Sequence, residues 1–86
     1  MSTQADWDQL RRRLQAMTAE VVAEIGAYPT PITACDAQFN RLLELRRLLP
    51  AELRRLEAAA GDPSSGVEEF VRASPCRSEL QAAARA

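Results

Sequence analysis

Two cysteines and eleven arginines are the side chains of this 86-residue sequence that could carry chemistry beyond packing. Cys35 and Cys76 are far apart, and the chain has no histidine. A structural zinc site needs four ligands at characteristic spacings, so this pair does not predict a metal centre. Without histidine, the usual base for a cysteine or serine nucleophile is missing. We therefore expect buried, inert thiols, no cofactor and no enzymatic activity. A disulfide between them stays open, and a thiol-based redox function would require an exposed cysteine.

The arginines stand in short runs: Arg11 to Arg13, Arg46-Arg47 and Arg54-Arg55. Neighbours on a helix lie about 100° apart, so these runs spread around a helix and do not line one stripe. The net charge is −1, from 11 basic and 12 acidic residues. No aromatic residues are interleaved for base stacking. We favour solvated faces whose arginine stems cover apolar surface, and keep a nucleic-acid-binding or regulatory protein as the alternative.

The elements that position these side chains are predicted to be helices. Alanine, leucine, glutamate and arginine abound, whereas valine and isoleucine are scarce. A first helix is expected over 5–28, with acidic residues near its start, where the helix dipole favours negative charge. Its apolar residues recur at steps of three and four and form one stripe: Trp7, Leu10, Leu14, Met17, Val21 and Tyr28.

A turn follows, because two prolines in "YPTPIT" cannot lie inside a helix. Either Thr30 or Thr33 could cap the second helix, which we expect over 34–60. Its predicted stripe is Cys35, Phe39, Leu42, Arg46, Leu49, Leu53, Leu56 and Ala60. This pattern stays in phase across Pro50, so we favour one kinked helix over a new helix beginning at Pro50.

The two stripes pair when the chain folds back at the Pro-Thr-Pro turn, which predicts an antiparallel hairpin. Arg46 then lies inside the apolar stripe, level with Met17. It could fix the register of the helices, or lean out to water where Pro50 bends the helix.

Two short helices are expected over 66–86. Ser65 and Glu68 have the spacing of a capping box for the first. Ser74 is placed to cap the second, with Pro75 as its first residue. The whole chain, 1–86, is thus one all-α domain: a long antiparallel helical hairpin with short C-terminal helices.

Apolar residues outside the two stripes, together with Trp7 near the open end of the hairpin, predict a contact surface. Leucines on the second helix point away from the first, small residues line the back of the first, and tryptophan is frequent at interface hot spots. These candidate residues are Leu43, Leu45, Leu48, Ala16, Ala19, Ala23 and Trp7. Either the C-terminal segment or a second copy could cover the leucines, and we favour a homodimeric bundle.

The sequence is therefore typical of a small non-catalytic helical interaction or dimerisation module. Its expected partner is itself or another helical protein. No apolar run reaches the roughly 18 residues of a membrane span, and the N-terminus lacks the apolar core of a signal peptide. The expected location is the cytoplasm.

Overall fold

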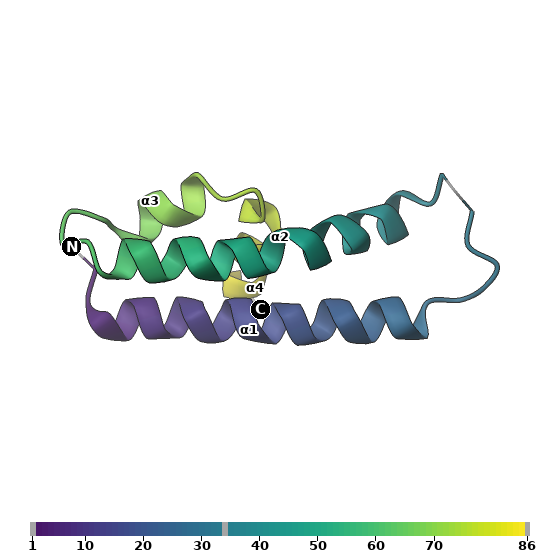
Figure 1. Cartoon of the computed structure of the whole chain (residues 1–86), viewed down its shortest axis with the longest axis horizontal. Coiled ribbons are helices and arrows are strands. Elements are labelled where there is room, and N and C mark those ends of the chain that lie inside the picture. The colour runs from purple at the N-terminus through teal and green to yellow at the C-terminus, as the bar shows by residue number, and fades with distance from the viewer. Residues whose placement is uncertain (1, 34, 86) are drawn as a thin grey trace.

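A computed structural model describes residues 2–33 and 35–85 of the chain, and these residues form four helices. They are α1 (Gln4–Ala27), α2 (Ala37–Ala60), α3 (Val67–Arg72) and α4 (Arg77–Arg85). α1 and α2 form a long antiparallel hairpin, and α3 and α4 lie over its middle and the end opposite the turn (Figure 1). The predicted all-helical hairpin is confirmed. None of the described helices is long and apolar enough to cross a membrane.

The hairpin has a covered and a bare part along its 48 Å length. We call the part beneath α3 and α4 the base. We call the turn-side part, residues 17–27 of α1 with residues 37–45 of α2, the arm. In the arm the two long helices pack mainly on each other (Figure 1), and α4 reaches only one face of it, where Arg41 binds Glu79.

Local side-chain chemistry defines both ends of α1. Thr3 and Asp6 form a capping box: the Thr3 hydroxyl accepts the Asp6 N–H at 3.2 Å, and the Asp6 carboxylate accepts the Thr3 N–H at 2.9 Å. The helix ends at Ala27, because Tyr28 precedes a proline and takes an extended conformation.

The start of α2 differs from both predicted threonine caps. Asp36 is the cap, since its carboxylate accepts the Phe39 N–H at 2.9 Å and the Tyr28 hydroxyl at 2.7 Å. Carboxylates are stronger acceptors than threonine hydroxyls, and this one satisfies two donors at once. α2 consequently begins at Ala37, so Cys35 precedes it and is exposed. The prediction of a buried Cys35 is wrong. Residue 34, the predicted first residue, lies outside the described residues.

α2 continues through Pro50 as one helix, as the unbroken pattern predicts. Proline has no N–H to give to the carbonyl of Arg46, which weakens the helix at this point. The second half of α2 runs beside α1, whereas the first half diverges from α1 towards the turn (Figure 1).

The buried side of α2 matches the predicted stripe in part: Leu42, Leu49 and Leu56 are buried as predicted, but Leu45 and Glu52 are buried in place of Arg46 and Leu53. Its buried residues are Leu42, Leu45, Leu49, Glu52 and Leu56. Arg46 is exposed and leans out to water, and Leu53 is only half-buried. The reason is that α2 packs against α1 on one side and the C-terminal helices on another, so its buried side turns towards Leu45 and Glu52. On α1 the buried stripe is Trp7, Leu10, Leu14, Met17 and Val21, as predicted, whereas the predicted sixth residue, Tyr28, follows the helix and is half-buried.

Contacts distant in sequence hold α3 and α4 on the base. The N-cap of α3 is Gly66, without a side-chain cap, so the predicted capping box of Ser65 and Glu68 is wrong. Instead the Val67 N–H donates to the Ser2 hydroxyl at 2.7 Å. Ser74 accepts the Cys76 N–H at 3.0 Å, as expected of a cap, although regular helix begins at Arg77.

Candidate functional site

Two of the predicted surface residues lie inside the chain's own core. Leu45 and Trp7 are both buried, and the Trp7 ring meets Phe70 edge-on at 5.9 Å. Leu48 is half-buried and packs against the core. The prediction that Leu45 is on an outer face is therefore wrong, whereas Trp7 lies in the core as its place in the predicted stripe implies and is not free to anchor a partner. Leu45 turns inward because the C-terminal helices cover the side of α2 on which it lies. The local sequence does not reveal that this side is covered.

The other predicted residues remain at the surface. Ala16, Ala19 and Ala23 are exposed, and Leu43 is half-buried. The most exposed large apolar side chain described is Val22, at 56%. The sequence prediction missed Val22. Its position one residue after the buried Val21 was the available signal.

Val22 and Leu43 lie on one side of the arm. Each follows a buried residue of its helix, Val21 or Leu42, by one position, which turns it about 100° from the buried direction. In antiparallel neighbours this rotation leads to the same face. Met17 and Leu45 are turned the opposite way, towards α4. The arm thus has two distinct faces, which we call the Val22 face and the α4 face.

The α4 face of the arm is hollowed by a groove of about 420 Å³ between α1, α2 and the end of α4. We call it the arm groove. Its apolar lining comprises Ala16, Met17, Val21, Leu42, Leu45 and Ala82. Its charged lining comprises Arg13, Glu20, Glu24 and Glu79, so the rim is predominantly acidic.

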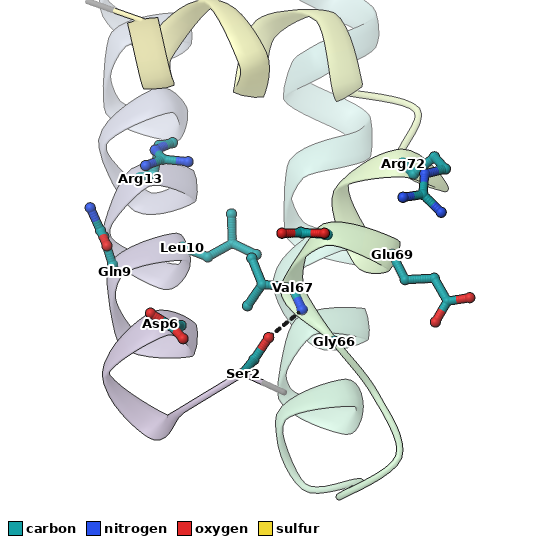
Figure 2. A pocket seen from close by; sticks show the side chains of 10 residues that line it. Ser2, Asp6, Gln9, Leu10, Arg13, Gly66, Val67, Glu69 and Arg72 are labelled. Carbon is teal, nitrogen blue, oxygen red and sulfur yellow. Dashed lines mark hydrogen bonds between the residues drawn. The ribbon is translucent and has the colours of Figure 1, made fainter.

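A second groove, of about 540 Å³, lies between α1 and α3 on the base. Leu10 and Val67 point towards each other across it, and the Ser2 hydroxyl caps α3 at one end (Figure 2). Arg72 and Glu69 point outward, away from α1 (Figure 2). The polar side chains thus do not converge on one point, as a small-molecule site would require.

The most buried polar cluster consists of Glu52, Arg55 and Ser74, and the sequence did not predict it. Its geometry indicates a role in holding the helices together. Glu52 is 4% exposed and accepts two hydrogen bonds from the Arg55 guanidinium, both at 2.8 Å, and one from the Ser74 hydroxyl at 2.7 Å. Arg55 also donates to the Phe70 carbonyl at 3.0 Å and lies 3.6 Å above the centre of the Phe70 ring. This cluster ties both C-terminal helices to α2.

Opposing effects act on the Glu52 carboxyl. Burial raises its pKa, whereas the hydrogen bonds from Arg55 and Ser74 lower it, and the net pKa lies below the ordinary value of 4.5. Glu52 therefore stays ionised and bound near neutral pH. All its neighbours are satisfied within the chain, so the cluster has no free group to offer a ligand.

A second arginine anchors α4. Arg41 donates to the Glu79 carboxylate at 2.7 Å and to the Pro75 carbonyl at 3.0 Å, and it also pairs with Glu44. The Arg41 hydrogen bond lowers the pKa of Glu79. Glu79 is thus already neutralised by the chain itself, unlike Glu20 and Glu24, which have no ion pair with any described residue.

The two thiols are in opposite environments and unbonded to each other. Cys76 is fully buried, and burial raises the pKa of its thiol. Cys35 is exposed before α2. Among the described residues, no three metal-ligating side chains gather in one place.

No family model, curated protein or solved structure matches this chain. Its function is therefore inferred from the geometry described above.

Proposed function

We propose that the chain is a small non-catalytic helical interaction module that forms a homodimer through the Val22 face of its arm. The observation that carries this proposal is the unequal covering of the hairpin. In the base, Leu14 and Leu49 are 0% exposed, whereas in the arm Met17 is 8% and Leu42 is 6% exposed. Val22 adds an apolar side chain open to water.

Packing further helices against the arm would bury apolar surface and is therefore favourable. A two-helix layer buries one stripe per helix, and a second pair of helices completes a four-helix bundle. Full burial of a valine side chain contributes about 1.5 to 3 kcal/mol. In a two-fold dimer the same patch of each protomer meets its copy on the other protomer. Val22 and Leu43 would therefore be buried in both protomers. Ala19 and Ala23 beside them allow close approach of a partner helix.

Solution mass tests the proposal directly. We would measure it by size-exclusion chromatography with light scattering over a wide dilution range, at low and high salt. We expect a dimer that persists at high salt, because the contact is apolar. Val22→Glu should dissociate it, and Ala5→Glu, in the exposed first turn of α1 far from the arm, should not. A monomer at every concentration would contradict the homodimer.

One observation favours the nucleic-acid alternative enough to test it. Arg47 and Arg54 are exposed, lie seven residues apart on one side of α2, and have no ion pair with any described residue. Binding of this kind would weaken steeply as salt rises, because phosphate contacts release counterions. A fluorescent DNA duplex that binds wild type but not Arg47→Gln/Arg54→Gln would support it. As part of the interaction proposal, we also propose that the protein is located in the cytoplasm.

A further inference from the structure

The arm groove lies on the face opposite Val22 and is open after the chain has folded. Its floor consists of side chains that are almost but not fully buried, among them Met17, Val21 and Leu45. On α1 the lining runs from Arg13 to Glu24, and at about 1.5 Å per residue this stretch spans about 17 Å, or about three helical turns. The groove lies between two diverging helices, and its length fits a short third helix.

Charge on the rim restricts what such a helix could be. Glu20 and Glu24 are exposed, stand four residues apart on one side of α1, and have no ion pair with any described residue. Like charges at this spacing repel each other and destabilise a helix slightly. A cationic partner would relieve that repulsion. Arg13, at the end near α4, is the one basic residue of the lining.

We infer that the arm groove is a docking site for a basic amphipathic helix of about three turns. The apolar stripe of this partner would pack on Met17, Val21 and Leu45. Its lysine or arginine side chains would pair with Glu20 and Glu24. Ala16 and Ala82 at the groove edges leave room for the partner backbone to approach. This helix-in-groove mode derives affinity from apolar anchors and orientation from charge.

The inference does not depend on the homodimer, because the Val22 face and the groove lie on different sides of the arm. A helix bound in the groove leaves Val22 and Leu43 free. The two proposals can therefore fail separately.

The test is a titration of the full chain into a fluorescein-labelled peptide of about 14 residues, followed by anisotropy. The peptide has leucines at positions i, i+3, i+4 and i+7, flanked by lysines. A second peptide carries glutamate at each lysine position. We expect the lysine peptide to bind at least about tenfold more tightly than the glutamate peptide, and to bind less tightly as salt rises.

Variants locate the binding. Glu20→Gln/Glu24→Gln should weaken the lysine peptide by about tenfold. Ala16→Trp should block the groove without disturbing the core, because Ala16 is exposed. The matched control is Glu68→Gln/Glu69→Gln, which removes two exposed charges from α3, outside the groove. Circular dichroism of each variant confirms that it is folded.

Three results would overturn the inference: no binding of the lysine peptide, equal binding of both peptides, or equal losses in the groove and control variants. If light scattering finds the dimer while the lysine peptide does not bind, the proposed function stands and this inference fails. If the peptide binds a chain that is monomeric at every concentration, the groove stands and the homodimer fails.

Discussion

Glu52 is the one buried charged residue among those that the structure describes. Glu52→Gln removes the charge but keeps the shape. We expect it to lower the free energy of unfolding by about 1 to 2 kcal/mol, a value reduced from that of a closed pair because Arg55 is 37% exposed. Glu57→Gln is the control, since Glu57 pairs with Arg11 at the surface and should cost less than about 0.5 kcal/mol. Urea unfolding measures both.

The same residue predicts the response to acid. The folded-state pKa of Glu52 is lowered, so its contribution is complete above its unfolded pKa and is lost as pH falls through the folded value. The free energy of unfolding should therefore decline as the pH drops below about 4.5, and Glu52→Gln should decline less steeply. Thermal unfolding at a series of pH values gives both slopes. Parallel slopes for wild type and variant would contradict this assignment.

The cysteines give a second residue-scale prediction. A thiol reagent such as DTNB should react rapidly with one thiol per native chain, because Cys35 is exposed, and with Cys76 only on unfolding, because it is buried. Cys35→Ser should abolish the rapid phase and leave the slow one. Rapid reaction of both thiols would mean that α4 leaves the base readily.

At the scale of elements, the start of α2 depends on one carboxylate. Asp36→Ala removes the acceptor of the Phe39 N–H and of the Tyr28 hydroxyl, so we expect it to cost about 1 kcal/mol of unfolding free energy. Thr30→Ala is the control, because Thr30 is exposed and lies before the observed cap. Chemical denaturation compares the two. A larger loss in Thr30→Ala would place the cap at the threonine.

Element boundaries show how far local sequence reaches. The capping chemistry and prolines act over three or four residues, so the limits of α1 and the continuity of α2 were predictable. The N-cap of α3 was not, because its first N–H is bound by Ser2, which is distant in sequence. The sequence pattern of a capping box does not show that a hydroxyl distant in sequence will bind the first N–H of the helix.

At the scale of the whole molecule, the base should be more stable than the arm. The base is covered by α3 and α4, whereas α4 reaches only one face of the arm and leaves the Val22 face bare. Backbone amides in residues 8–14 and 51–56 should therefore exchange with solvent more slowly than those in residues 18–27 and 39–45. Hydrogen exchange with mass spectrometry measures this difference, and addition of the lysine peptide should reduce it. Equal protection in base and arm would contradict the unequal packing.

The sequence by itself determined the helices, the hairpin and the buried stripe of α1. The reason is that propensity, capping and the helical period are local properties. Only the tertiary structure decided which side of α2 is inside, because that side depends on two neighbours at once. The sequence predicted Arg46 on the buried side of α2, but Leu45 and Glu52 are buried instead. The reason is that α4 and the Ser74 hydroxyl, which come from the far end of the chain, reach these two residues. By covering the base and only one face of the arm, the same two short helices also decided which apolar residues remain open to a partner.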